Sequence, residues 1–342
     1  MAQVNDIGID LGTSNVLIYM KGKGIVLREP AVVAVDRDTS TVLDVGTNAY
    51  QMIGKTPSNV MTVRPLRQGT LNDFELLNTM LRQFMHMAVG KHWFIGPRAV
   101  ISVPSGVNEV EKRHIISIMF EAGARKTQLL DRPVAAALGI GLDFSVPYGT
   151  MVVDMGAGMS DIAVLSMGEV VVGSSIPIGG DYFNDAIIRY MRKKHNLLIG
   201  ERTAEDLKIN IGAAVPQQNN VEMDVTGRNL VSGMPKTLMV SSTEVYEALQ
   251  DPVSELIESI QGVIERTPPQ LASDIFEEGI LLSGGASALT GLAEAVYNVL
   301  GIPCGVVDDP QNCVAIGCAR ALSDSPDMKK LLGTPGKRRW VR

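Results

Sequence analysis

Two segments a half-chain apart share one pattern, in which an apolar strand ends in Asp, an apolar residue and Gly, and small residues lead into a second apolar strand. The first segment contains Asp10, Gly12, Thr13, Ser14 and Asn15, and the second contains Asp154, Gly156, Ala157, Gly158 and Met159. A glycine turn between strands directs successive backbone N–H groups into one concavity, which suits an anion. Either copy alone is typical of an ordinary hairpin. The pair indicates duplicated halves that hold a polyphosphate from both sides.

The carboxylates of Asp10 and Asp154 end these strands and would face the same phosphates. Such an arrangement requires a cation between the negative groups. Mg²⁺ suits the position because it keeps several waters and accepts one or two carboxylates together with phosphate oxygens.

A third glycine turn lies between an apolar strand, 280–283, and a helix. It contains Gly284, Gly285, Ala286 and Ser287. Glycines let a ligand approach the backbone, and a helix N-terminus favours negative charge. Many α/β proteins end a strand in Gly-Gly, so this turn supports phosphate binding only in combination with the other two.

A fourth segment, Gly200–Lys208, is typical of a helix start, with Thr203 and Asp206 arranged like a capping box. Glu205 and Lys208 are three residues apart and share a helix face. Their spacing alone predicts a surface salt bridge.

These segments must be held by an α/β framework, because short β-rich runs bounded by glycine alternate with helical stretches throughout. Apolar spacing predicts a helix over Asn72–Ala88, and the acidic residues Glu109 and Glu111 favour a helix start near Asn108. Further helices are expected from Pro133, over Asp181–His195 and over Leu289–Leu300.

The 342 residues suggest about two domains and carry a net charge of −6. The last fourteen residues contribute six positive charges and none negative, which leaves −12 on the rest. An acidic body argues against nucleic-acid binding. No apolar run reaches the ~18 residues needed to span a bilayer, and the first six residues show no signal pattern. The three cysteines lack metal-ligand spacing, which indicates packing in a reducing cytosol.

The four segments, in this order, resemble the superfamily of sugar kinases, chaperone ATPases and actins. The resemblance narrows to the MreB family of bacterial actin homologues, and within it to the Mbl branch, over residues 4–322. It is carried by the segments Asp6–Ile18, Lys21–Pro30, Ile199–Asp206, Asp309–Pro310 and Cys313–Gly317. This resemblance implies an actin-like α/β fold whose two domains close over ATP and Mg²⁺. It also implies polymerisation into membrane-bound filaments that organise cell-wall synthesis and rod shape, on the cytoplasmic face of the membrane.

The expected domain I spans residues 1–140 and 310–342, and domain II spans 141–309. Domain I would include a small subdomain at about 31–66 and a membrane loop at about 91–97. Domain II would include a small subdomain at about 181–241. The expected partners are further copies of the chain, an anionic membrane surface and the cell-wall elongation machinery.

By position, the resemblance assigns nucleotide contacts to all four segments. Thr13, Ser14 and Asn15 would form the first phosphate turn with Gly12, and Gly156, Ala157, Gly158 and Met159 would form the second. Glu205, Asp206, Leu207 and Lys208 would flank the nucleoside, Gly284, Gly285, Ala286 and Ser287 would lie under it, and Asp10 and Asp154 would face the Mg²⁺ waters.

The chain departs from the family in the second phosphate turn, where the family usually has Gly-Gly-Gly-Thr-Thr and this chain has Gly-Ala-Gly-Met-Ser at 156–160. Ala157 needs a backbone conformation that accepts a Cβ. Met159 removes one hydroxyl, whereas Ser160 keeps the other.

A second departure lies before the Ala-rich helix, where the family usually has Glu-Glu-Pro and this chain has Asp131-Arg132-Pro133. The family's acid helps to orient the attacking water. Arg132 can stabilise phosphate charge but cannot accept a proton. Asp131 can substitute only if the turn rotates, so we expect ATP binding with slow hydrolysis, and Asp131 and Ser160 are the candidate catalytic residues.

Membrane contact is expected at Trp93 and Phe94, because aromatic rings beside basic residues favour a membrane interface. The alternative is that both rings fold back onto the core, and the family's hydrophobic membrane loop favours insertion. Arg338, Arg339 and Trp340 in the basic tail are a second candidate, although such tails are most often solvated.

Two other functions fit the same superfamily. A small-molecule kinase would transfer the γ-phosphate to a sugar hydroxyl and would need an acid placed as a general base near the cleft of the second domain. A chaperone ATPase would need a substrate-binding region after the nucleotide domain, and the sequence offers none.

Overall fold

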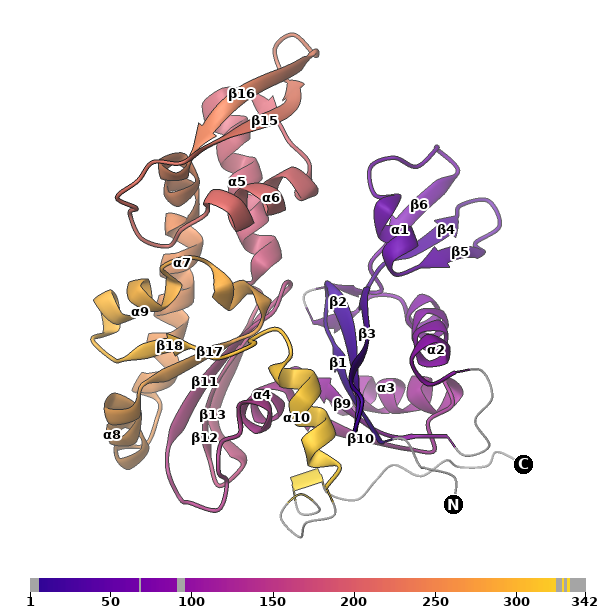
Figure 1. Cartoon of the computed structure of the whole chain (residues 1–342), viewed down its shortest axis with the longest axis vertical. Coiled ribbons are helices and arrows are strands. Elements are labelled where there is room, and N and C mark those ends of the chain that lie inside the picture. The colour runs from indigo at the N-terminus through magenta and orange to yellow at the C-terminus, as the bar shows by residue number, and fades with distance from the viewer. Residues whose placement is uncertain (1–5, 68, 91–95, 324–327, 329–330, 333–342) are drawn as a thin grey trace. The chain divides into compact units, whose positions relative to one another are not determined.

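The computed structural model describes residues 6–67, 69–90, 96–323, 328 and 331–332. The chain divides into two compact units (Figure 1). Unit 1 comprises the described residues of Met1–Tyr148, Leu165–Ser175 and Gln311–Arg342, and unit 2 those of Gly149–Val164 and Ile176–Pro310.

Unit 1 is built on a five-stranded sheet of order β10-β9-β1-β2-β3. The strands are β1 (Asp6–Leu11), β2 (Asn15–Met20), β3 (Gly24–Pro30), β9 (Arg98–Val103) and β10 (Lys126–Asp131). β1 pairs in parallel with β9, which pairs in parallel with β10, while β1–β2 and β2–β3 are antiparallel. The carboxyl ends of three strands therefore meet at one edge, where open α/β sheets bind their ligands. That edge carries Asp10, Ser102 and Asp131.

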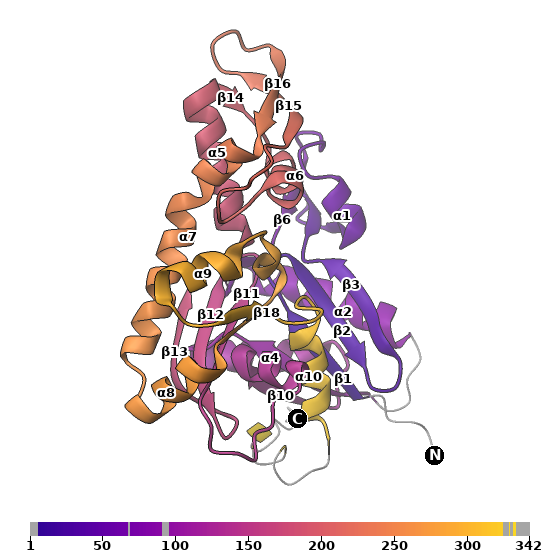
Figure 2. The same cartoon turned by 60° about the vertical axis from the view of Figure 1, so that its left-hand side comes forward.

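Helices cover both faces of this sheet. α2 (Phe74–Val89) and α3 (Glu109–Glu121) lie on one face, and α4 (Arg132–Ile140) and α10 (Cys313–Ala321) on the other (Figures 1 and 2). The predicted helices near Asn72 and Asn108 are confirmed, because Asp73 caps α2 and Asn108 forms a complete capping box with Glu111. α4 and α10 pack so closely that a Cβ on Gly317 would lie 1.7 Å from the Ala135 carbonyl oxygen.

A second, smaller sheet of unit 1 has the order β5-β4-β6. It consists of β4 (Val33–Asp36), β5 (Val42–Val45) and β6 (Val60–Val63), with α1 (Thr47–Gln51) packed against it. Val32, Ala34 and Ala49 form a buried apolar cluster of their own. β7 (Leu66–Arg67) and β8 (Thr70–Leu71) form a two-stranded ribbon that returns the chain to α2.

The second five-stranded sheet has the order β13-β12-β11-β17-β18. Its strands are β11 (Thr150–Met155), β12 (Ser160–Ser166), β13 (Glu169–Ile176), β17 (Ile280–Ser283) and β18 (Cys304–Val306). β11, β17 and β18 run parallel, so Asp154 and Ser283 are paired at the carboxyl ends of neighbouring strands. The two predicted strand–turn–strand copies are thus β1–β2 and β11–β12.

Unit 2 adds a small antiparallel sheet and several helices. The sheet contains β14 (Leu197–Leu198), β15 (Glu222–Asn229) and β16 (Pro235–Ser241), and the helices are α5 (Gly180–His195), α6 (Glu201–Ile211), α7 (Ser242–Glu265), α8 (Pro269–Glu278), the 3₁₀ helix η1 (Gly285–Ala288) and α9 (Leu292–Leu300). α5 matches the predicted helix within one residue. α9 begins three residues later than predicted, because Thr290 forms a β-bridge with Ala213 and Gly291, with a positive φ angle, is the N-cap of the helix.

The predicted helix start at Thr203 is wrong. α6 begins at Glu201 after Gly200, which supplies no side-chain cap, and Thr203 lies inside the first turn. An i,i+3 pair of Thr and Asp inside a helix has the same spacing as a capping box, so the sequence pattern did not distinguish the two.

Cys313 and Cys318 are buried, and Cys304 is half-buried, all as free thiols. The described part of the chain contains no helix with the length and apolar character needed to cross a bilayer.

Candidate functional site

The first predicted phosphate turn is a tight connection between β1 and β2. The Gly12 N–H donates to the Asn15 carbonyl oxygen at 3.1 Å, and the Ala31 N–H donates to the Ser14 carbonyl oxygen at 2.8 Å. Thr13 is buried, Ser14 is half-buried and Asn15 is exposed. The turn is therefore fixed from both sides by backbone hydrogen bonds.

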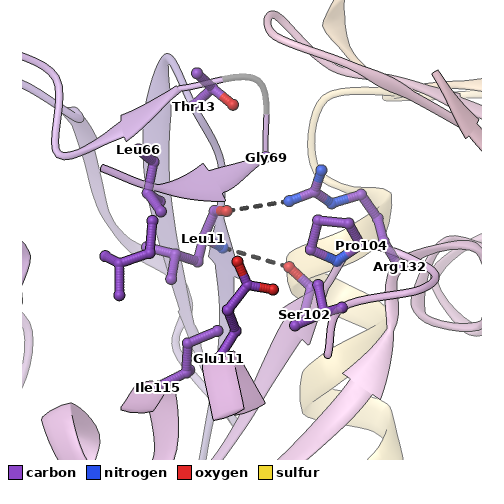
Figure 3. Close-up of a pocket in the computed structure, with 11 residues that line it drawn as sticks. Leu11, Thr13, Leu66, Gly69, Ser102, Pro104, Glu111, Ile115 and Arg132 are labelled. Carbon is purple, nitrogen blue, oxygen red and sulfur yellow. Dashed lines mark hydrogen bonds between the residues drawn. The ribbon is translucent and has the colours of Figure 1, made fainter. Parts of the chain in front are cut away.

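Asp10 lies at the carboxyl end of β1 and is held by its neighbours at the sheet edge. The Ser102 hydroxyl donates to Asp10 Oδ1 at 2.9 Å and accepts from the Leu11 N–H at 3.3 Å. Arg132 Nη2 donates to the Leu11 carbonyl oxygen at 3.0 Å (Figure 3). The same nitrogen lies 3.9 Å from Asp10 Oδ1. The sequence pattern identified Asp10 and Arg132 separately, whereas the structure brings them together and adds Ser102.

A pocket in unit 1 opens beside this cluster (Figure 3). Its polar lining comes from Thr13, Ser102, Glu111 and Arg132, and its apolar lining from Leu11, Leu66, Leu71, Pro104, Val107 and Ile115, with Gly69. Glu111 was identified in the sequence only as a helix-start residue. Its carboxylate accepts from the Asn108 N–H at 3.3 Å while it lines the pocket.

Asp131 is the last residue of β10 and precedes α4. It is half-buried, in register with Val103 of β9, and is not among the residues that line the pocket. Arg132, one residue later, is the group of this segment that faces Asp10.

The second predicted phosphate turn joins β11 to β12. The Gly156 N–H donates to the Met159 carbonyl oxygen at 2.9 Å, while the Gly156 and Ala157 carbonyl oxygens accept from the Gly180 and Asp181 N–H groups. Ala157 is not among the residues with a positive φ angle, so its Cβ causes no backbone strain. The turn is thereby tied to the first residues of α5.

The side chains after this turn point into the protein. Met159 is buried, and the fully buried Ser160 donates its hydroxyl hydrogen to the Ile178 carbonyl oxygen at 2.5 Å. Ser160 thus fixes β12 to the segment before Gly179. Asp154, at the end of β11, is 3% exposed.

A polar network links α5 and α6 in unit 2. Lys208 Nζ lies 2.7 Å from Glu205 Oε2 and donates to the Gly180 carbonyl oxygen at 3.0 Å. The Asn184 amide also donates to Glu205 Oε2, at 2.6 Å. Leu207 is buried in the core and Asp206 is exposed. The pair that the spacing identified as a surface salt bridge is therefore part of a partly buried cluster around Gly180.

The third glycine turn follows β17. Gly284 has a φ of 82°, and a Cβ there would lie 2.3 Å from the Met155 carbonyl oxygen, so only glycine fits. Its N–H donates to the Pro310 carbonyl oxygen, and the buried Ser287 hydroxyl donates to the Gly284 carbonyl oxygen. Gly285 and Ala286 form the first turn of η1.

The predicted site residues thus fall into two groups. Unit 1 holds Asp10, the first turn, Asp131 and Arg132, and unit 2 holds Asp154, the second turn, the α6 pair and the third turn. The predicted membrane residues Trp93, Phe94, Arg338, Arg339 and Trp340 lie outside the described residues.

Comparison with known proteins decides the family. The model of the MreB/Mbl protein family matches residues 4–330. The chain belongs to the MreB/Mbl family.

Individual members of the MreB/Mbl family match over nearly their whole length. The chain is 43% identical to the cell shape-determining protein Mbl of Bacillus subtilis over 325 residues, 95% of this chain and 98% of Mbl. It is 44% identical to the cell shape-determining protein MreB of Escherichia coli strain K12 over 323 residues, 93% of each chain. Both sequence identities are consistent with membership of the Mbl branch, and they do not distinguish Mbl from MreB.

Solved structures place this MreB/Mbl chain in the actin-like fold. The crystal structure of MreB5 of Spiroplasma citri bound to AMPPNP superposes with a TM-score of 0.87 at 33% identity, covering 93% of this chain and 95% of MreB5. A MamK double helical filament gives a TM-score of 0.80 at 21% identity over 95% of this chain and all of MamK, which is a likeness of fold alone.

Proposed function

We propose that this chain is an ATP-binding, actin-like cytoskeletal protein that polymerises into membrane-associated filaments and organises cell-wall synthesis and cell shape. The observation that carries the proposal is the pair of strand–turn–strand units. Each places an Asp one residue before the end of a strand and continues into a turn fixed by backbone hydrogen bonds. Membership of the MreB/Mbl family, whose relatives are named cell shape-determining proteins, supports the same function.

ATP is the proposed ligand, because a solved relative with 33% identity is bound to AMPPNP. The turns at Thr13–Asn15 and Gly156–Met159 would bind phosphate through backbone N–H groups. Glu205 and Lys208 would contact the nucleoside, with Gly284–Ser287 beneath it.

Mg²⁺ is proposed to accompany the phosphates, but the two expected carboxylates differ in how well they fit it. Asp154 is a buried carboxylate two residues before Gly156 of the second turn, which suits a water-mediated contact. Asp10 fits poorly, because the Arg132 guanidinium already supplies a positive charge 3.9 Å from its carboxylate.

Hydrolysis is proposed to be slow. Arg132, the first residue of α4, lines the unit 1 pocket. Its guanidinium has five N–H donors and no acceptor. It can neutralise phosphate charge, but it cannot accept a proton from an attacking water. Asp131 and Ser160 are the candidate catalytic residues, and Ser160 would have to release its hydrogen bond to the Ile178 carbonyl oxygen in order to act.

The partners proposed are further copies of this chain, the cell-wall elongation machinery and an anionic membrane on its cytoplasmic face. Membrane contact would use Trp93 and Phe94 with the basic tail, where each base near an anionic leaflet contributes about 1 kcal/mol. Filament assembly multiplies such weak contacts. The family assignment does not favour the small-molecule kinase alternative.

Sedimentation of the purified chain with and without ATP tests the proposal, followed by electron microscopy on a lipid monolayer. We expect ATP-dependent pelleting without any phosphoryl acceptor. A Lys208→Met variant should lose it, and a matched Lys126→Met variant at an exposed unit 1 position should keep it. Acceptor-dependent ATP consumption without pelleting would favour the kinase.

The membrane part has its own experiment. Co-sedimentation with anionic liposomes should weaken for Trp93→Ala/Phe94→Ala and for a chain cut after Leu332. Undiminished binding by the variant that combines both changes would contradict membrane association through these segments.

A further inference from the structure

The Arg132 guanidinium occupies a fixed position beside the first phosphate turn. Its side chain is 6% exposed, and Nη2 donates to the Leu11 carbonyl oxygen at 3.0 Å. The same nitrogen lies 3.9 Å from Asp10 Oδ1, and the side chain lines the pocket together with Thr13. Arg132 therefore places a permanent positive charge in the pocket that Thr13 of the first turn also lines. The charge is permanent because a guanidinium stays protonated in proteins.

The surrounding structure determines this position. Arg132 is the first residue of α4, and α4 starts directly at the carboxyl end of β10. β10 and β1 both pair in parallel with β9, so the start of α4 and the end of β1 share one sheet edge. Ser102, on β9 between them, donates to the same Asp10 oxygen that faces Arg132.

This arrangement changes what Asp10 can do for a bound polyphosphate. A carboxylate beside phosphates requires a nearby positive charge, and a divalent metal ordinarily supplies it. Here the charge of Asp10 is already balanced by Arg132 at ion-pair distance. A divalent cation at Asp10 would meet both a neutralised carboxylate and a repelling guanidinium.

We infer that Arg132 is a built-in cation that takes the place of a divalent metal at Asp10, so that the affinity of this chain for nucleoside triphosphate depends less on Mg²⁺ than the affinity of an Arg132→Gln variant does. The inference rests on the proposed nucleotide site and extends it to the choice of counter-ion. It concerns binding, and it is independent of the rate of hydrolysis.

Isothermal titration calorimetry of the full chain with AMPPNP, below the concentration at which it polymerises, tests the inference. The quantity compared is the ratio of the dissociation constant in EDTA to that in excess Mg²⁺. We expect the wild-type ratio to stay below about tenfold. For Arg132→Gln this ratio should be higher than the wild-type ratio by a factor of about ten or more. A factor of this size corresponds to the free energy of one hydrogen bond to a charged group.

Two further variants make the result specific. Arg320→Gln is the matched control, because Arg320 bonds the Leu138 and Gly139 carbonyl oxygens at the other end of α4. It should keep the wild-type ratio. Asp10→Asn leaves Arg132 in place, and it should tighten binding in EDTA, because it removes the negative charge of Asp10 that faces both the guanidinium and the phosphates.

The outcomes separate the inference from the proposed function. Equal ratios for wild type and Arg132→Gln, or a strong loss of AMPPNP–Mg²⁺ binding in Asp10→Asn, would overturn the fixed-cation role while leaving nucleotide binding intact. No AMPPNP binding by wild type even with Mg²⁺ would overturn the proposed function and the inference together. If Arg132→Gln does not fold, the result of Asp10→Asn decides.

Discussion

The side-chain amide of Asn184 on α5 donates a 2.6 Å hydrogen bond to the carboxylate of Glu205 on α6, across 21 residues of sequence. The same Glu205 oxygen pairs with Lys208, which in turn donates to the Gly180 carbonyl oxygen. Asn184 is 6% exposed and the Glu205 side chain is 38% exposed, so the bond is partly shielded from water. The orientation of the proposed nucleoside contacts thus depends on a residue that does not belong to any of the four sequence segments.

The first prediction concerns Asn184. Asn184→Ala removes the hydrogen bond that orients Glu205, and we expect ATP affinity to fall by about three- to tenfold, as for a net loss of ~1 kcal/mol. Asn210→Ala is the matched control, because Asn210 bonds the backbone of α6 at an exposed position. Titration calorimetry with AMPPNP measures both variants. Unchanged affinity in Asn184→Ala would show that Glu205 is positioned without it.

The second prediction concerns hydrolysis. Arg132→Glu places a proton acceptor in the wall of the unit 1 pocket. The rate of phosphate release by purified polymer at saturating ATP should therefore rise by about tenfold or more, as expected for a general base. The Arg320→Gln variant should release phosphate at the wild-type rate. Release by wild type that equals or exceeds that of Arg132→Glu would contradict the slow-hydrolysis hypothesis.

Local patterns in the sequence predicted much of the framework. The β1–β2 and β11–β12 hairpins follow from the repeated Asp-x-Gly, and the start of α3 follows from Asn108 and Glu111, because both features depend on residues within a few positions of one another. The prediction of a helix start at Thr203 was wrong because it also relied on local spacing, and a three-residue spacing of Thr and Asp also occurs inside a helix.

The candidate site was less accessible to sequence analysis, because its contacts join residues that are far apart in the chain. Ser102 reaches Asp10 across 92 residues, and Arg132 reaches Leu11 across 121. These contacts depend on the parallel order of β1, β9 and β10, which no local spacing encodes. The sequence showed that Arg132 departs from the family pattern. Its position beside Asp10 became evident only from the three-dimensional structure.

The third prediction concerns stability of unit 1. Arg98 on β9 binds Asp6 on β1 through two nitrogens, with Nε to Oδ1 at 2.8 Å and Nη2 to Oδ2 at 2.5 Å. Asp6 is 8% exposed, so Arg98→Met leaves a largely buried carboxylate without this partner and should cost about 1–3 kcal/mol in the free energy of unfolding. Urea denaturation measures the change.

Lys112→Met is the control for that measurement. Lys112 pairs with Glu109 at 3.1 Å on the surface of α3, with the Glu109 side chain 75% exposed. An exposed pair of this kind contributes less than about 1 kcal/mol. If Arg98→Met proves no more destabilising than Lys112→Met, the Asp6–Arg98 pair does not stabilise the sheet.

The fourth prediction concerns pH. Glu244 at the start of α7 has a pKa below its usual value. Partial burial raises it, but the Ser241 N–H and the His195 side chain, at 3.0 and 2.8 Å, together with Lys194, outweigh burial and lower it. A carboxyl group with a lowered pKa in the folded state stabilises that state above its unfolded pKa. That stabilisation is lost as pH falls through the lowered folded value.

Glu244→Gln should therefore reduce stability at pH 7 and make no difference at a pH below both values, where the wild-type carboxyl is protonated as well. Urea unfolding midpoints at pH 7 and at a pH low enough to protonate the Glu244 carboxyl in the folded state measure this difference. Glu258→Gln on the same helix is the control, because Glu258 has an exposed side chain. An equal loss of stability at both pH values would mean that Glu244 acts through hydrogen-bond geometry at the N-terminus of α7 and not through its charge.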